Sequence, residues 1–188
     1  MKTNDDMNAD PARDDMLILV DGLDREIGTA TKWHAHAEGL LHRAFSVVLT
    51  REDAEGNAQL MLSQRAMGKY HSGGLWANSC CSHPRAGEAV VDAACRRVQE
   101  ELGCNAADLR EIGAFAYRAE FADGLSEHEY DHVLVGRCVG EPSPDQSEVA
   151  AVRWVSYDEL ARELAEQPTH FAAWAPMVLS IALSDLAR

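Results

Sequence analysis

Runs of apolar residues, some alternating with polar ones, predict a series of β-strands along the chain. Each run is bounded by glycine, proline, aspartate or asparagine, which favour turns. The predicted strands cover residues 17–20, 26–31, 44–50, 59–64, 112–119, 130–139 and 149–155. Turns at residues 21–22, 52–57 and 122–124 are placed to join neighbouring strands as hairpins.

A second pattern, in which apolar residues recur at helical spacing, predicts helices in the middle and at the end of the chain. In residues 88–102 every fourth position is apolar: Val90, Ala94, Val98 and Leu102. Gly103 is suited to end that helix, because glycine readily adopts the left-handed conformation. A capping box at residues 156–159 opens a helix that extends to residue 166, and a last helix is expected within residues 171–186. Residues 32–41 form a mixed polar segment with no assigned element.

Strands interleaved with a few helices indicate a single domain of the α/β or α+β class. With 188 residues, of which 46% are hydrophobic, the chain can bury a substantial core. We expect the domain to cover residues 15–188, preceded by a flexible acidic tail over residues 1–14. No apolar run approaches the roughly 20 residues that span a bilayer, so no membrane association is expected.

The formal net charge of −14 excludes nucleic acid as an expected partner, because phosphate neutralisation needs a basic surface. An anionic small molecule would need local cations or a divalent metal, and only three residues are lysines. Five cysteines without a secretory signal favour a reducing, cytoplasmic compartment. We expect a monomer or a weak dimer.

Candidate chemistry centres on residues 78–84, where Cys81 lies two residues before His83. Cys81 could be a nucleophile or a proton carrier, although a buried inert thiol is the alternative. Glu127 and Glu129 face the same side of a strand, roughly 7 Å apart. These carboxylates would bind a divalent metal, or would form a solvated strand face. Glu100 and Glu101 leave the same two alternatives open at a helix end, solvation or a bound Mg²⁺.

The histidines do not specify a metal site by their spacing. His36 and His42 are six residues apart, which is not the helical spacing of three or four. No role is assigned to His34, His71, His128, His132 or His170. The loop over residues 65–74, with its cations Arg65 and Lys69, is expected to be mobile and at the surface.

Residues 82–104 resemble the Nudix box, G-x5-E-x7-R-E-U-x-E-E-x-G-U. Glu88, Arg96 and the Glu100-Glu101 pair match that pattern. Ser82 stands where the box has its first glycine, and Arg97 stands where it has a glutamate that belongs to the metal-binding acidic cluster. The resemblance implies a Nudix-like mixed β-sheet sandwich flanked by helices. Arg97 argues against the hydrolysis of diphosphates, the activity of most Nudix enzymes.

Five segments together resemble one branch of that superfamily, the type I isopentenyl diphosphate isomerases. The matching segments, in chain order, are LLHRAFS (40–46), WANSCCSHP (76–84), RR with ELG (96–103), YRA (117–119) and EHE (127–129). This resemblance implies a shift of a double bond by protonation and deprotonation, which interconverts isopentenyl and dimethylallyl diphosphate. The substrate would be a small prenyl diphosphate.

The resemblance also implies the roles of individual residues. The proton-transfer residues would be Cys81 and Glu129, with Tyr117 assisting. An Mn²⁺ or Zn²⁺ site would be formed by His36, His42, His83, Glu127 and Glu129. Glu101 would hold an Mg²⁺ that bridges to the substrate. Lys32, Arg65, Lys69 and Arg97 would bind the diphosphate, and Trp174 would face the hydrocarbon.

Glu129 would protonate the double bond and Cys81 would remove a proton from the opposite face, with loop 65–74 and the segment near Lys32 closing over the site. Two rival readings remain. One is a Nudix hydrolase of nucleoside or prenyl diphosphates. The other is a non-catalytic metal-binding or interaction domain.

Overall fold

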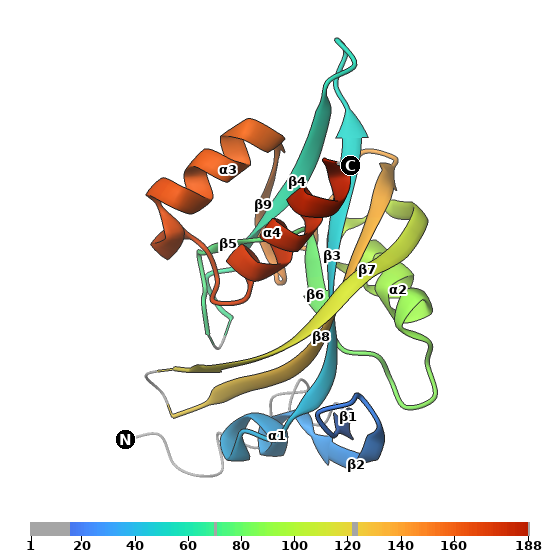
Figure 1. The fold of residues 1–188 in the computed structure, drawn as a ribbon, viewed down its shortest axis with the longest axis vertical. Helices are drawn as coiled ribbons and strands as arrows, with labels where there is room; N and C mark the ends of the chain where they lie inside the picture. Colours follow the sequence, from blue (N-terminus) through green and yellow to red (C-terminus); the bar gives the residue numbers. More distant parts are fainter. Residues whose placement is uncertain (1–15, 70, 122–123, 188) are drawn as a thin grey trace.

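The computed structural model describes residues 16–69, 71–121 and 124–187, which form a mixed α+β fold built on one sheet (Figure 1). The strands are β1 (Met16–Val20), β2 (Glu26–Thr31), β3 (His42–Glu52), β4 (Ala58–Arg65), β5 (Trp76–Ala77), β6 (Cys80–Ser82), β7 (Asn105–Glu120), β8 (Ser126–Val139) and β9 (Val149–Ser156). The helices are α1 (Lys32–Glu38), α2 (Val90–Leu102), α3 (Tyr157–Glu166) and α4 (Ala175–Leu186), with a short 3₁₀ turn at Pro168–His170.

Strand β3 lies at the centre of the sheet and brings together strands that are far apart in the sequence. It pairs in parallel with β8, so that His42 lies opposite Glu129. It pairs antiparallel with β6, so that Ser46 lies opposite Cys81. Strands β1 and β4 also pair with it, and β7 continues the sheet beyond β8 as the other arm of a long hairpin. The two pairings of β3 place a thiol and a carboxylate on the two strands that flank it.

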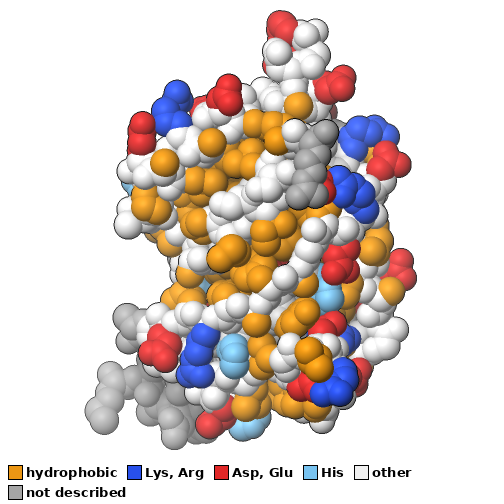
Figure 2. Space-filling view, in the orientation of Figure 1, with side chains coloured by type: hydrophobic (Ala, Val, Ile, Leu, Met, Phe, Trp, Pro, Cys, Tyr) orange, Lys and Arg blue, Asp and Glu red, His pale blue; other side chains and the backbone are white. Residues whose placement is uncertain are grey.

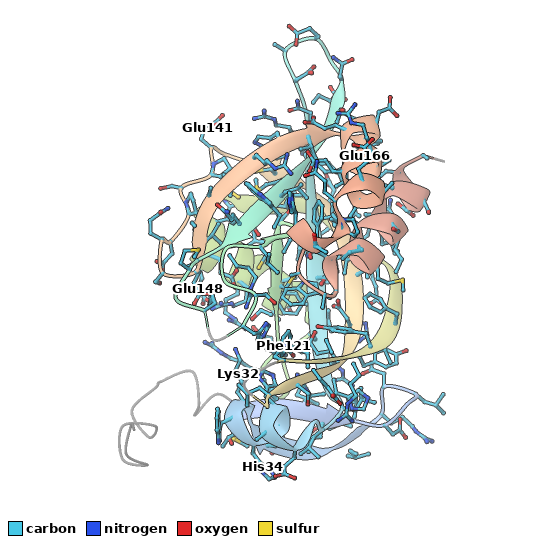
Figure 3. All side chains as sticks on the ribbon, turned by 90° about the vertical axis from the view of Figure 1, so that its left-hand side faces the viewer. Lys32, His34, Phe121, Glu141, Glu148 and Glu166 are labelled. Carbon is cyan, nitrogen blue, oxygen red and sulfur yellow. The ribbon has the colours of Figure 1, made fainter. Side chains whose placement is uncertain are left out.

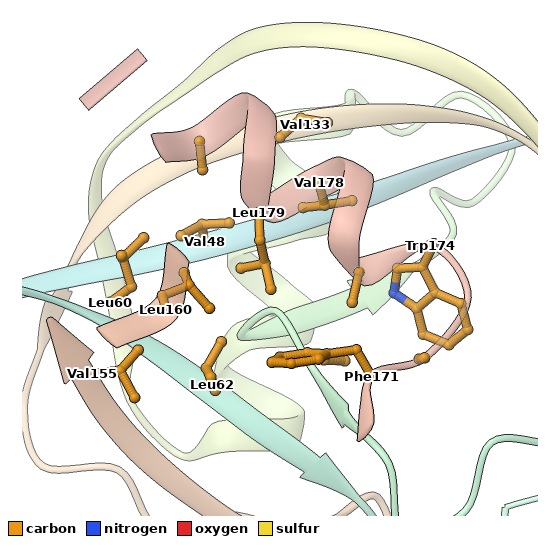
Figure 4. Close-up of a cluster of buried hydrophobic side chains, with 14 of the residues drawn as sticks. Val48, Leu60, Leu62, Val133, Val155, Leu160, Phe171, Trp174, Val178 and Leu179 are labelled. Carbon is orange, nitrogen blue, oxygen red and sulfur yellow. The ribbon is translucent and has the colours of Figure 1, made fainter. Parts of the chain in front are cut away.

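Helices cover the sheet on both faces, because β3 is apolar on both of its sides. Val48 packs in a cluster with α3, α4 and the segment around Trp174 (Figure 4). Phe45, Val47 and Leu49 pack on the other face against α2. In the view of Figure 2, hydrophobic side chains gather over the middle of the molecule, and charged ones lie mostly toward the rim.

The predicted strands are confirmed, but some of their bounds differ. Strand β7 begins at Asn105, because register shifts after residues 107 and 111 interrupt the alternation that marks a strand. Helix α4 begins only at Ala175, because Phe171 instead bridges to Trp76. Helix α2 begins at Val90. The expected tail over residues 1–14, and residues 122–123 of a predicted turn, lie outside the described residues.

The segment left without an element contains helix α1. The helix is short, and its ends carry the signals that form it. The hydroxyl of Thr31 accepts a hydrogen bond from the amide of His34, and Gly39 ends the helix in the left-handed conformation at φ 63°. In the part of the chain that is described, no helix has the length and apolar character to cross a membrane.

Substituting Gly103 tests how much the left-handed turn at the end of α2 contributes to stability. The φ of this glycine is 64°, and a Cβ there would lie 2.5 Å from the carbonyl oxygen of Ser143. That residue cannot easily retreat, because its amide donates to Leu102 at 2.8 Å. We expect Gly103→Ala to lower the free energy of unfolding by about 3 kcal/mol, from backbone strain and overpacking together, measured by denaturant titration.

Gly56 supplies the matched control, since its φ is 83° but a Cβ would meet nothing within 4 Å. Gly56→Ala should cost only the backbone strain, about 1 kcal/mol. Equal losses in the two variants would contradict the packing account.

Candidate active site

One pocket contains almost every residue that the sequence singled out. Its walls come from the start of α1, from β6 and β8, from α2, and from the loop between β4 and β5. The predicted residues that line it are Lys32, Arg65, Lys69, Cys81, His83, Arg97, Glu101, Tyr117, Glu127, Glu129 and Trp174. His36 and His42 are buried behind it and approach its carboxylates, whereas Glu100 is exposed and does not line it.

Three imidazoles and two carboxylates form a cluster at the back of the pocket. Ligand atoms of His36, His42, His83 and Glu127 all lie within 4.8 Å of one another. His36 Nε2 is 3.4 Å from Glu127 Oε2, and His42 Nε2 is 3.6 Å from Glu129 Oε1. His83 Nε2 lies 3.0 Å from the same Glu129 oxygen.

Two of these separations, 3.0 and 3.4 Å, match those between ligands of one divalent cation, and the third, 3.6 Å, is slightly longer. Two atoms that each lie about 2.1 Å from one ion are about 3.0–3.4 Å apart in octahedral or tetrahedral geometry. His42 hydrogen-bonds through Nδ1 to the carbonyl of Leu40 at 2.8 Å, which leaves Nε2 with its lone pair toward the cluster. Burial lowers the pKa of His36 to about 2 and that of His83 to about 4, so both rings are in the neutral form that binds metals.

The two carboxylates need a positive partner. Glu127 is 4% and Glu129 is 9% exposed, so the alternative of a solvated strand face is wrong. Burial and the charge of Glu129 raise the pKa of Glu127 well above its usual range. Burial also opposes the ionisation of Glu129, but hydrogen bonds with His42 and His83 hold its pKa well below that range. A divalent cation would let both carboxylates ionise.

Local structure explains how the cluster assembles. The short helix α1 places His36 against β8, where the hydroxyl of Ser126 donates to the His36 carbonyl at 3.3 Å. The parallel pairing of β3 with β8 sets His42 beside Glu129. Alternation along β8 then turns Glu127 to the same face.

Cys81 lies in the pocket wall with its sulfur held by neighbours. Trp174 Nε1 donates to the sulfur at 3.0 Å, and the thiol lies 3.1 Å from Asn78 Oδ1. The Asn78 amide is oriented by donating to the carbonyls of Val47 and Cys80, so its oxygen faces the thiol. Burial raises the pKa of Cys81 to about 12, and the group is therefore a protonated thiol in this state.

Tyr117 contacts the carboxylate on the far side of the pocket. Its hydroxyl donates to Glu129 Oε2 at 2.6 Å, while the other oxygen of Glu129 faces His83. Burial raises the pKa of Tyr117 well above its usual range, so its proton stays available for this hydrogen bond. A proton could pass between the two groups without passing through water.

Four cations line the pocket: Lys32, Arg65, Lys69 and Arg97. Arg97 Nη2 lies 2.5 Å from Glu101, as the i,i+4 spacing on α2 predicts. The Arg65 guanidinium lies 5.1 Å from the centre of the Trp174 ring. Lys32, at the start of α1, lines the same pocket.

Sequence reasoning missed three residues of this site. His71 was given no role, and its loop was expected to be mobile and exposed. Instead the ring is buried, lies 2.6 Å from Glu127 Oε1 and stacks on Phe121 at 4.2 Å. Asn78 and Glu148 were not singled out either. For His71 and Asn78, the one available indication was that each lies near a predicted site residue in the sequence, Lys69 and Cys81 respectively.

Comparisons with known proteins agree with these features. The NUDIX domain family model matches residues 40–175. The isopentenyl-diphosphate Delta-isomerase of Burkholderia multivorans is 50% identical over 161 residues, covering 86% of this chain and 89% of that protein. The enzyme of the same name from Photobacterium profundum is 45% identical over 175 residues, covering 92% and 97%.

Among solved structures, a crystal structure of a Deinococcus radiodurans protein matches with a TM-score of 0.64 and 17% identity. The match covers 87% of this chain and 97% of that one. At this identity the likeness shows a common fold.

The metal centre can be tested with paired histidine variants. His36→Ala removes one imidazole from the cluster and should weaken Mn²⁺ or Zn²⁺ binding at least about tenfold. The measurement is metal titration by calorimetry, with bound metal counted by elemental analysis.

His34→Ala is the control, because His34 is exposed and lies two residues away on the same helix. It should bind metal as the unmodified protein does. Equal metal binding by the two variants would exclude His36 from the site.

Proposed function

The chain belongs to the NUDIX domain family and, within it, to the isopentenyl-diphosphate Delta-isomerases, and from this premise we propose that it interconverts isopentenyl and dimethylallyl diphosphate. One observation carries the assignment of residues. Cys81, from β6, and Glu129, from β8, line the same pocket as a group of cations and an indole ring. This arrangement supplies two proton-transfer groups, an anion site and an apolar surface.

The pocket's polarity orients the substrate. The diphosphate would bind Lys32, Arg65, Lys69 and Arg97, which line the pocket. The hydrocarbon would then lie against Trp174, beside the sulfur of Cys81. A positive charge that develops on the substrate's tertiary carbon would be stabilised by the π face of that indole.

Each proton step is assigned to a side chain of this pocket. Glu129 would deliver a proton to the terminal carbon of the double bond, with Tyr117 at hydrogen-bond distance to relay it. Cys81 would remove a proton from the carbon next to the one that bears the diphosphate. In this direction Glu129 starts protonated and Cys81 starts as a thiolate, and the step ends with the ionised carboxylate and the protonated thiol described above. The reverse reaction starts from that state, and repeated turnover in one direction requires the proton to return from Cys81 to Glu129. One C–H bond forms and another breaks, so the double bond moves without a net redox change.

The residues that would hold a divalent cation, Mn²⁺ or Zn²⁺, are His36, His42, His83, Glu127 and Glu129. When bound, the ion supplies positive charge that favours the ionised forms of the two buried carboxylates. Glu101 would hold Mg²⁺ together with oxygens of the diphosphate, as Mg²⁺ prefers. The donor set of nitrogen and oxygen atoms suits these ions.

Water must be excluded, because it would convert a carbocation into an alcohol. We propose that loop 65–74 closes the pocket and that His71 fastens it, since this ring contacts both Glu127 and Phe121. Arg65, at the start of the loop, lies over the ring of Trp174, and this contact also supports closure of the pocket by the loop.

The alternative of a diphosphate hydrolase is less well supported. Hydrolysis in this family uses an acidic cluster at the box position that Arg97 occupies. Here Arg97 forms ion pairs with Glu100 and Glu101.

We further propose that residues 15–188 form the isomerase domain and that it works as a monomer or weak dimer in the cytoplasm. The free thiols of all five cysteines support a reducing compartment.

Removal of the thiol tests the function and the role of Cys81 together. Proton NMR of isopentenyl diphosphate incubated with the protein and Mg²⁺ should show dimethylallyl diphosphate accumulating. Cys81→Ala should lower this rate at least about 10³-fold, because it removes one of the two proton-transfer groups, while calorimetry should find diphosphate binding retained.

Cys95→Ala is the control, since Cys95 lies on α2 and does not line the pocket. It should turn over normally. A Cys81→Ala variant with a near-normal rate would remove the thiol from the mechanism. Release of inorganic phosphate instead of isomerisation would support the hydrolase.

A further inference from the structure

Glu148 places a carboxylate among the cations of the pocket. It immediately precedes β9 and lines the pocket, and it lies on the same side of the molecule as Lys32 in Figure 3. Its carboxylate accepts a hydrogen bond from Lys69 Nζ, and its Oε2 lies 3.8 Å from Arg97 Nη2. Two of the four cations proposed to bind diphosphate are therefore already near an internal anion.

The backbone fixes this contact. The Glu148 carbonyl accepts from the amide of Ala66 at 3.0 Å, and its amide donates to Asp145 at 2.9 Å. The Ala66 carbonyl in turn accepts from the amide of Lys69 at 3.1 Å. Lys69 and Glu148 thus belong to one hydrogen-bonded unit. Their pairing follows from the fold, unlike an ion pair between two freely moving surface chains.

Glu148 is a carboxylate at neutral pH. Burial opposes its ionisation, but the hydrogen bond from Lys69 and the nearby charge of Arg97 lower its pKa. Glu101 adds a second carboxyl group to the same pocket. A free diphosphate that enters must compete with Glu148 for Lys69 and Arg97, and it meets like charge as it does so.

A diphosphate that carries Mg²⁺ meets a different situation. Mg²⁺ in proteins is held by one or two carboxylates together with phosphate oxygens. The cation of the complex therefore compensates the charge of Glu148 and Glu101 when the anion takes over Lys69 and Arg97. The same carboxylate that repels the free anion attracts its magnesium complex.

We propose that Glu148 is a specificity residue that makes the pocket select the magnesium complex of a diphosphate over the free diphosphate. The proposal rests on the proposed function, because it takes the cations around Glu148 to be the diphosphate site. This role and a purely structural role predict opposite effects of Glu148 on the affinity for free diphosphate. A residue that only held Lys69 and Arg97 in place would strengthen the binding of both forms.

The test is calorimetric titration with inorganic diphosphate, in the presence of a chelator and again in saturating Mg²⁺. Glu148→Gln keeps the shape of the side chain and removes its charge. We expect this variant to bind free diphosphate at least about fivefold more tightly than the unmodified protein does. The factor by which Mg²⁺ strengthens binding should fall by at least the same amount.

Glu100→Gln is the matched control. Glu100 lies 2.9 Å from Arg97 Nη1 but does not line the pocket, so both affinities should change less than about twofold. Glu148→Ala should repeat the result of the glutamine variant, and thermal melting should show that each variant is folded.

Glu148→Gln protein that binds free diphosphate no more tightly, or binds both forms more weakly, would overturn the proposal. An unmodified protein that binds diphosphate under neither condition would instead contradict the proposed function.

Discussion

The burial of Glu127 and Glu129 side by side on β8 is the constraint on which the site depends. Two like charges in a protein interior are costly unless cations or hydrogen bonds compensate them. Three histidines from separate segments converge on them: His36 from α1, His42 from β3 and His83 from the end of β6. Neutral imidazoles do not supply the missing positive charge, whereas a divalent cation bound among them would.

The same strand pairings that build this cluster also position the two groups that we propose to transfer protons. Because β3 pairs with both β6 and β8, Cys81 and Glu129 are held to one rigid sheet. The thiol is held by Trp174 and Asn78, and the carboxylate by Tyr117 and His83. Rigid placement suits a reaction in which protons must reach and leave specific carbons. The acidic character of the chain is offset locally, because four cations line the pocket beside its four glutamates.

Much of the fold could be predicted from the sequence, since the apolar run of β3, the alternation in β4 and the apolar stripe of α2 follow simple patterns. Helix α1 could not, because its seven residues have no apolar stripe, and the helix depends on its caps at Thr31 and Gly39 and on the burial of Ala35 against distant residues. The spacing of Glu127 and Glu129 along β8 was compatible with a metal site or a solvated strand face, because their burial depends on residues distant in the chain. His71 was missed for the same reason, since its contact with Glu127 spans 56 positions.

The most direct test of this account is anomalous diffraction from crystals grown with Mn²⁺. The account predicts one strong peak at the manganese edge, about 2.0–2.3 Å from the nearest nitrogen or oxygen of each of the five ligands. These ligands are His36, His42, His83, Glu127 and Glu129. A cluster without such a peak, with the two carboxylates sharing a proton or paired only with the histidines, would contradict it.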